Sequence, residues 1–324
     1  MKAILTSLAA CLIAGSAAAQ TRPAMNFLPR DKQIEVIAAL CDGLGIRAVS
    51  RITGVNRGTV AALALRLGRG CAELHDRMMV GLRVSRCELD ELWSYVGKKQ
   101  KRVTPKDIAV TGDQYTFVAL ASAARAIIAY RTGKRDTHNT IEFIHDLRER
   151  VIGSPEISTD GFTPYTTAIR HAFGNRIAHG VIVKTYSVTN LAVKDAARRY
   201  SPAEVIAVER EVVSGVPSHI STSYVERSNL TLRMSSKRFS RLSNGFSKKL
   251  EPHCAAVSLY VAHYNLCRVH ESLRSTPAMA LGIAERVWTV GDLLDAALAT
   301  QPIDPVVTAP DRRKRFRVID GGKE

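Results

Sequence analysis

The sequence lacks the features of an exported, disulfide-stabilised or membrane-spanning protein. It has 6 cysteines in 324 residues, and no two of them have C-x-x-C spacing. So few scattered thiols argue against a disulfide framework and are typical of a reducing compartment. Beyond the N-terminal segment, no apolar run is as long as a transmembrane helix requires. We therefore predict a cytoplasmic, nucleoid-associated protein with no membrane partner.

Acidic residues are also scarce. There are 30 Asp and Glu against 46 Lys and Arg, which gives a net charge of +16. Such an excess favours a polyanionic partner, usually nucleic acid, although a generally basic surface without a specific role stays open. With 46% hydrophobic and 23% charged residues, the composition is that of a globular protein long enough for more than one domain.

Residues 1–24 look like a secretory signal. Lys2 precedes an apolar stretch that ends in small residues, Ala17 to Ala19. The basic remainder argues against export, and Met25 opens "MNFLPRDKQIEVIAAL", which has the character of a domain start. We interpret 1–24 as upstream sequence joined by a mis-called start, with Met25 as the true start. A genuine signal and an additional helix are the alternatives.

Residues 25–70 are predicted to form a helix-turn-helix domain. Apolar residues have helical spacing over 30–42, and two short amphipathic segments follow in "GIRAVSRITGVNRGTVAALALRLG", 45–68. Gly54 lies where a tight turn is needed, and Asn56 is placed to cap the second helix. The positions expected to face inward are Ala48, Val49, Ile52, Val55, Val60, Leu63 and Leu67. Two short helices joined by a glycine turn are typical of this motif.

The second helix of a helix-turn-helix enters the major groove by its N-terminal end. We therefore expect contacts with double-stranded DNA from Arg47, Asn56, Arg57 and Thr59. A small helical bundle without DNA contact is the alternative.

Beyond residue 84 the pattern changes to strands alternating with helices. "RCELDELWSYVG", 86–97, has a period of two, and further strands are expected at 114–124, 126–134, 155–165 (ending at Asp160) and 177–186. Helices are expected at 139–151, capped by Asn139, and at 164–173, with a flexible basic loop after residue 97. This order indicates an α/β or α+β sheet domain.

Three acids on these elements are candidate metal ligands. Asp90 lies inside an apolar strand and Asp160 at a strand end before a glycine, and both places are costly for an unpaired carboxylate. Glu226, in "STSYVERSNLTLR", 221–233, lies on a predicted helix. Hard oxygen ligands suit magnesium or manganese, so the three acids together predict a site for such an ion. Taken singly, each acid is also explained as an ordinary turn or surface residue.

Two polar residues share the helical face of Glu226. Asn229 and Arg233 follow it at i+3 and i+7, so they are expected to reach phosphate while Glu226 binds metal. Further phosphate contacts are expected from the basic segments after this helix, from Lys237, Arg238, Lys248 and Lys249. For each of these cations a solvated surface role is the alternative.

Several segments together resemble DDE transposases of insertion sequences, specifically the insertion sequence 1 family. They are "ELDELWSYVGKKQK", "STDGFTPY", "ARRYSPAEVIAVEREVVSG", "HISTSYVERSNLTLRMSSKRFSRLSNGFSKKL" and "HYNLCRVHESLRSTPAMALGI". The resemblance extends from Met25 to about residue 290 and is most specific over 219–283. The sequence departs from relatives at Ala121 and Ala123, where aspartates are frequent, and it lacks the N-terminal zinc finger of some members.

The resemblance implies a ribonuclease H-like catalytic core with a mixed five-stranded sheet. It assigns the catalytic acids to Asp90, Asp160 and Glu226, which would hold two Mg²⁺ or Mn²⁺ ions and cleave and join DNA strands at element ends. Partners would be element ends, target DNA and further copies of the chain in a homo-oligomer. A catalytically dead repressor and a ribonuclease H-type nuclease are the alternatives.

The expected division of the chain follows from these assignments. The helix-turn-helix domain covers 25–70 and the catalytic domain 84–270. A helical extension over 271–300 and a basic tail over 301–324, expected to be disordered, complete the chain.

Overall fold

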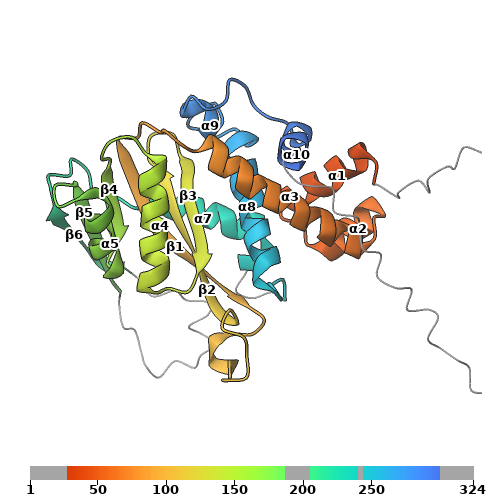
Figure 1. Cartoon of the computed structure of the whole chain (residues 1–324), viewed down its shortest axis with the longest axis horizontal. Coiled ribbons are helices and arrows are strands. Elements are labelled where there is room, and N and C mark those ends of the chain that lie inside the picture. Colours follow the sequence, from red (N-terminus) through yellow and green to blue (C-terminus); the bar gives the residue numbers. More distant parts are fainter. Residues whose placement is uncertain (1–27, 187–204, 240–243, 300–324) are drawn as a thin grey trace, which may run out of the picture.

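The protein is built on a mixed β-sheet with helices on both faces and a further group of helices at one end (Figure 1). This computed structural model describes residues 28–186, 205–239 and 244–299. The signal-like segment 1–24 and the basic tail 301–324 lie outside the described residues, so the expectations about them stay untested. Within the described ranges, no helix has both the length and the apolar character needed to cross a membrane.

The N-terminal region forms three helices, α1 (Arg30–Cys41), α2 (Ile46–Thr53) and α3 (Arg57–Met78). Between α2 and α3, Gly54 has the left-handed φ of 73° that the turn requires, and the Asn56 side chain accepts the Gly58 N–H at 2.8 Å. One expectation is wrong, because Ile52 is 65% exposed rather than inward-facing. α3 continues to Met78, and its later turns pack against helices that follow the sheet in the sequence.

The sheet has the strand order β3-β2-β1-β4-β5-β6. β1 is parallel to β4 and β4 to β5, whereas the other neighbours are antiparallel. The strands are β1 (Arg86–Val96), β2 (Gly112–Ala121), β3 (Ala126–Gly133), β4 (Glu156–Asp160), β5 (His179–Tyr186) and β6 (Val205–Ser214). This mixed sheet with flanking helices confirms the expected ribonuclease H-like α/β fold.

A sixth strand corrects the expectation of five. β6 pairs with β5 at the edge of the sheet, and nine of its ten residues are exposed. Its centre carries Glu209, Arg210 and Glu211 in succession, so neither face has the apolar period of two that marks a half-buried strand. The pairing with β5 is therefore a tertiary feature that local sequence does not encode.

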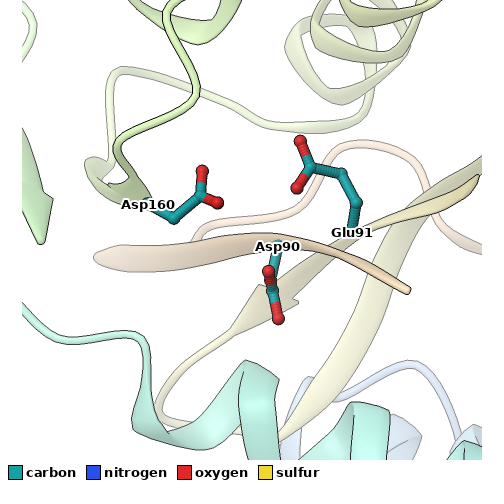
Figure 2. Close-up of side chains that lie close together, drawn as sticks. All are labelled: Asp90, Glu91 and Asp160. Carbon is teal, nitrogen blue, oxygen red and sulfur yellow. The ribbon is translucent and has the colours of Figure 1, made fainter. Parts of the chain in front are cut away.

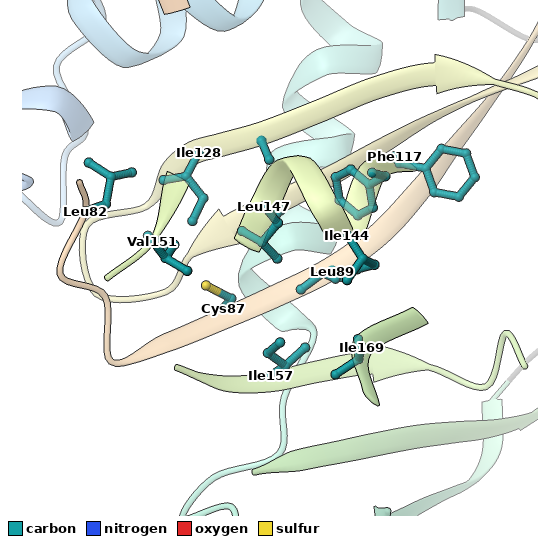
Figure 3. Packing of buried hydrophobic residues seen from close by; sticks show 14 of the residues in the cluster. Leu82, Cys87, Leu89, Phe117, Ile128, Ile144, Leu147, Val151, Ile157 and Ile169 are labelled. Carbon is teal, nitrogen blue, oxygen red and sulfur yellow. The ribbon is translucent and has the colours of Figure 1, made fainter. Parts of the chain in front are cut away.

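Helices cover the two faces of the sheet separately. α4 (Thr137–Arg150) and α5 (Pro164–Phe173) pack on one face, where Leu89 and Phe117 meet Ile144 and Ile169 (Figure 3). α7 (Ser223–Ser235) and α8 (Leu250–Leu266) pack on the other face, where Leu92 lies. Leu89 and Leu92 therefore mark opposite faces of β1, as strand alternation requires.

The start of α4 and the segment after β1 differ from expectation. The N-cap of α4 is Asp136, whose carboxylate accepts the Asn139 N–H at 2.8 Å, so Asn139 lies inside the helix and is not its cap. After β1, the expected flexible loop contains the short helix η1 (Gln100–Arg102), and an ion pair of 2.7 Å joins Lys98 to Asp107.

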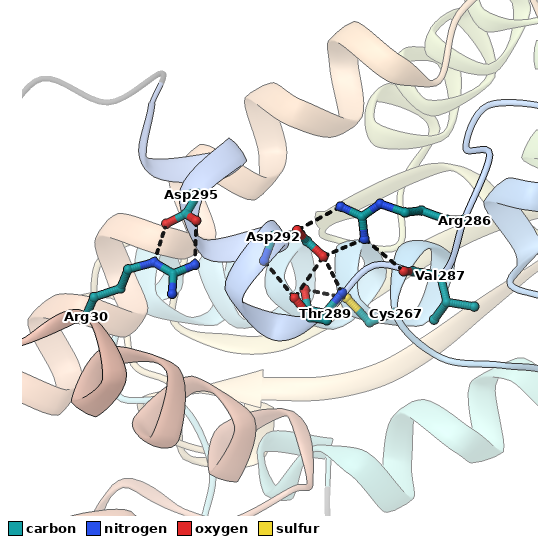
Figure 4. Close-up of polar contacts among 7 residues, drawn as sticks. All are labelled: Arg30, Cys267, Arg286, Val287, Thr289, Asp292 and Asp295. Atoms are coloured by element: carbon teal, nitrogen blue, oxygen red, sulfur yellow. Dashed lines mark hydrogen bonds and ion pairs between the residues drawn. The ribbon is translucent and has the colours of Figure 1, made fainter.

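The first and last described helices pack together. α3 contacts α8 and the C-terminal helix α10 (Val290–Leu298), which follows the short α9 (Pro277–Ala280). The contacts are close, because a Cβ added at Gly68 would lie 2.2 Å from the Ala255 carbonyl oxygen. Figure 4 shows the bidentate pair of Arg30 in α1 with Asp295 in α10 (2.6 and 3.0 Å), next to the capping box at the start of α10.

Candidate metal centre

Two of the three predicted acids lie at neighbouring positions in the sheet. β1 carries Asp90, and β4, which runs parallel beside it, ends at Asp160. One carboxylate oxygen from each, together with one from Glu91, lie within 4.8 Å of one another. Figure 2 shows Asp90 and Glu91 extending to opposite sides of β1, with Asp160 beside them. The strand order thus brings three carboxylates together at one place.

The carboxylates of β1 are buried, and burial is the largest influence on their acidity. It raises the pKa of Asp90 to about 6, with a further rise from the charge of Asp160. It raises the pKa of Glu91 to about 8, again aided by Asp160. The side chain of Glu91 is 3% exposed, compared with 39% for that of Asp160. Ionising these carboxylates is therefore costly in the metal-free protein, and a bound cation would offset that cost.

Arg135, just after β3, is the nearest cation to this group. Its Nη2 lies 3.5 Å from Glu91 Oε2 and 3.4 Å from Asp160 Oδ2, and its guanidinium lies 3.9 Å from the centre of the Phe162 ring. Both N–O distances are long for ion pairs, so the pairing is weak. They lower the pKa of Glu91 by less than burial and Asp160 raise it, so Arg135 compensates the charge of the cluster only in part.

Helix α7 approaches Asp90 from the face of the sheet opposite to α4 and α5. Asn229 is 3% exposed and donates from Nδ2 to Asp90 Oδ2 at 2.8 Å. Glu226, one turn earlier, is not within the three-residue group, but its charge contributes to the raised pKa of Asp90. Its carboxylate accepts hydrogen bonds from Lys184 of β5 and from Thr222 (2.6 Å). Glu226 therefore lies next to the centre, but its carboxylate is paired with Lys184.

The donors of the site suit a hard divalent cation. All available ligand atoms are oxygens, as magnesium and manganese prefer. Two of them, Glu91 Oε1 and Asn229 Oδ1, are buried without a hydrogen-bond partner. Buried oxygens of this kind are costly unless something satisfies them. These unpartnered oxygens indicate, independently of the acidic charge, that the residues present are suited to hold a metal ion.

Glu91 is the site residue that sequence reasoning missed. It follows Asp90 directly in "ELDEL", and both acids interrupt an apolar strand. That interruption of an apolar strand was the available signal. Its proximity to Asp160, however, depends on the packing of β4 and α5 beside β1.

The expected DNA-contacting residues after α7 lie in different environments. Lys237 and Lys249 are exposed, and Lys248 lies 3.1 Å from the centre of the Phe246 ring. Arg238, in contrast, is turned inward. It donates to Ser247 Oγ at 3.0 Å, and burial lowers its pKa. Arg233 lies on α7 and is half-buried.

The expected contacts of the N-terminal helices lie at the surface. Asn56, Arg57 and Thr59, at the start of α3, are exposed, and so is Arg47, near the start of α2. The remaining faces of these helices are occupied by the cluster that includes Val49, Val60, Leu63 and Leu67. The turn thus presents polar and basic side chains outward.

Comparisons with known proteins return structural likenesses. No protein-family model and no curated protein sequence matches the chain. Among solved structures, it is similar to a piggyBac transposase synaptic complex with hairpin DNA at 11% identity and a TM-score of 0.36, covering 83% of this chain and 69% of that one. It is also similar to a pre-cleavage Mos1 transpososome at 12% identity and a TM-score of 0.22, covering 84% and 79%. The ribonuclease H-like fold follows from the strand order and directions, not from these likenesses.

Proposed function

We propose that the chain is a transposase of the DDE type, related to the insertion sequence 1 family, that cleaves and joins DNA strands at the ends of a mobile element. The observation that carries the proposal is the meeting of Asp90 and Asp160 on parallel neighbouring strands, with buried unsatisfied oxygens beside them. The net charge of +16 supplies attraction for a DNA backbone.

Each acid has a role in this proposal. Asp90, Asp160 and Glu226 hold the metal, and Asn229 keeps Asp90 oriented by its 2.8 Å hydrogen bond. Two magnesium or manganese ions, when bound, would activate an attacking oxygen and stabilise the leaving oxygen. Lys184 and Thr222 both bind Oε1 of Glu226, so the other oxygen, Oε2, is the proposed ligand atom, and Lys184 stands beside it as a candidate phosphate contact.

DNA contacts are proposed at two places. The start of α3 offers Asn56, Arg57 and Thr59 to a groove, and the start of α2 offers Arg47, in the manner of a helix-turn-helix over 25–70. Near the acids, the proposed phosphate contacts are the exposed Lys237, Lys248 and Lys249 and the half-buried Arg233. Asn229 and Arg238 were expected here too, but Asn229 is 3% exposed and bonded to Asp90, and Arg238 is turned toward Ser247, so either would have to reorient to reach phosphate. In solution the DNA-bound form would be a homo-oligomer, since two element ends must be brought together.

The proposal is tested by strand joining in vitro. The full chain is incubated with Mg²⁺, a supercoiled plasmid and a labelled duplex carrying the DNA that borders its coding region. We expect labelled strands to become joined to the plasmid, and EDTA to abolish the joining. Asp160→Asn should abolish joining but leave duplex binding intact, because it removes a ligand charge from a position that is 39% exposed.

The other functions correspond to other outcomes of the same assay. Cleavage without joining would indicate a ribonuclease H-type nuclease. Duplex binding without cleavage in any divalent metal would indicate a repressor that has lost catalysis. Joining that is unchanged in Asp160→Asn would refute the proposed metal centre.

A further inference from the structure

The first turn of α7 donates hydrogen bonds to a carboxylate from a distant part of the chain. Glu88 of β1 is 3% exposed, and its Oε2 accepts the backbone N–H groups of Tyr224 at 2.7 Å and Val225 at 3.0 Å. Its other oxygen, Oε1, accepts a hydrogen bond from the Ser122 hydroxyl at 3.3 Å. Both oxygens of this buried side chain are thus engaged.

The N-cap residue of α7 does not cap it, and within the described part of the chain only the Ser223 N–H has a local side-chain partner, Ser221 Oγ at 3.2 Å. The first backbone N–H groups of any helix lack partners within that helix, and a side chain at the N-cap usually accepts one of them. Thr222 is the N-cap of α7, but its side chain makes no such bond and donates instead to Glu226 at 2.6 Å. Glu88, from 136 residues earlier, takes over the capping role, and its negative charge also suits the positive end of the helix dipole.

This arrangement connects the three proposed metal-binding elements. Glu88 precedes Asp90 by two residues on β1, so both side chains extend from the same face of the strand. Glu226 directly follows Val225, whose N–H the Glu88 carboxylate holds. A second bond fastens the approach to the helix, because the Ser221 N–H donates to Ser158 Oγ of β4, the strand that ends at Asp160.

We propose that Glu88 is a positioning residue of the metal centre: by capping α7 from β1, it fixes where Glu226 and Asn229 stand relative to Asp90. The inference rests on the proposed metal-dependent function. Glu88 touches neither metal nor DNA in this role, since both its oxygens are occupied by the helix and by Ser122. It acts through α7, whose first turn it joins to β1.

The test measures binding of Mn²⁺ by electron paramagnetic resonance in the full chain without DNA. Glu88→Ala should weaken Mn²⁺ binding roughly tenfold, as loss of a supporting residue around a metal typically does. Glu88→Gln should retain near wild-type binding, because a single amide oxygen can accept both N–H groups of α7. Asp292→Ala is the matched control, since it removes a carboxylate that supports the start of α10, away from the acids, and should leave Mn²⁺ binding unchanged.

A double-mutant comparison separates positioning from general damage. If Glu88 acts through Glu226, Glu88→Ala should weaken Mn²⁺ binding in the wild-type background and have little further effect in Glu226→Gln. Equal weakening in both backgrounds, or binding within twofold of wild type in Glu88→Ala, would overturn the proposal. Where Glu88→Ala fails to fold, Glu88→Asp serves instead. Its side chain is shorter by one methylene, so wild-type Mn²⁺ binding in that variant would equally overturn the inference.

Failure of this inference and failure of the proposed function are distinguishable. The Mn²⁺ measurement needs no DNA and no turnover, so a wild-type chain that joins no strands still reports on Glu88. In an active chain, Glu88→Ala should lower the turnover of strand joining and leave the KM for duplex DNA unchanged, because the α2–α3 surface is untouched.

Discussion

Replacing Glu91 by glutamine should stabilise the metal-free protein and do so more strongly at higher pH. Burial raises the pKa of Glu91 from 4.5 to about 8 in the folded state. A carboxyl whose folded pKa is raised contributes stability below its unfolded pKa, and loses it as the pH rises through the folded pKa. The window for this residue is therefore from pH 4.5 to about 8. Glutamine has nearly the same shape and does not titrate.

The magnitude follows from the two pKa values. At pH 7 the unfolded glutamate is ionised whereas the folded one is mostly protonated, so Glu91→Gln should raise the free energy of unfolding by about 3 kcal/mol. At pH 5 the unfolded glutamate is only partly ionised, and the gain should fall to about 1 kcal/mol. The difference between the two pH values, about 2 kcal/mol, is independent of any packing change that the substitution causes.

Urea denaturation in EDTA at pH 5 and pH 7 measures both gains. Glu149→Gln, at an exposed position on α4, is the control and should change the free energy of unfolding by less than about 0.5 kcal/mol at either pH. An equal gain at both pH values, or no gain at pH 7, would refute the reasoning, because it would mean that Glu91 is ionised in the folded protein throughout this range.

Three further perturbations have defined outcomes. Arg57→Ala should weaken duplex binding and lower the salt dependence of log K by about one, as measured by fluorescence anisotropy at several salt concentrations; an unchanged slope would remove Arg57 from the DNA interface. Burial, followed by the charge of Arg150, lowers the pKa of His75 to about 3, so its contribution to stability is lost as the pH falls below 6.5. Between pH 7 and pH 5, the wild type should lose about 2 kcal/mol more than His75→Gln in urea denaturation, and parallel pH profiles would contradict this. Gly68→Ala should destabilise by about 1–2 kcal/mol despite the better helix propensity of alanine, because its Cβ would meet the Ala255 carbonyl oxygen; a raised urea midpoint would show that α3 and α8 separate easily.

Local patterns in the sequence predicted much of the fold. The period of two in β1 and the glycine between α2 and α3 are local signals, and the structure has that strand within one residue of its expected bounds and the turn at Gly54. The sequence likewise predicted correctly that Asp90 lies within a strand and that Asp160 lies at a strand end. That β1 and β4 are parallel neighbours, and so bring the two acids together, is a property of the sheet.

Features that depend on distant partners were not predictable in the same way. Consecutive acids on a strand face opposite sides, and the sequence does not say what each side meets, so the role of Glu91 beside Asp160 was missed. The engagement of Glu226 by Lys184 and the capping of α7 by Glu88 join segments far apart in the chain. The strand β6 was missed because its stability comes from pairing with β5 and not from its own apolar pattern.

The packing of α3 against α8 and α10 has a consequence for biosynthesis. The apolar side of α3, with Leu67 and Cys71, is covered by helices that are made some two hundred residues later, including Leu259 and Leu293. Contacts so distant along the chain carry a high loop-closure entropy and form late. While the chain is still on the ribosome, its first helices therefore have an apolar side that is uncovered until the later helices have been made. The N-terminal helices can therefore complete their packing only after α8 and α10 have been synthesised.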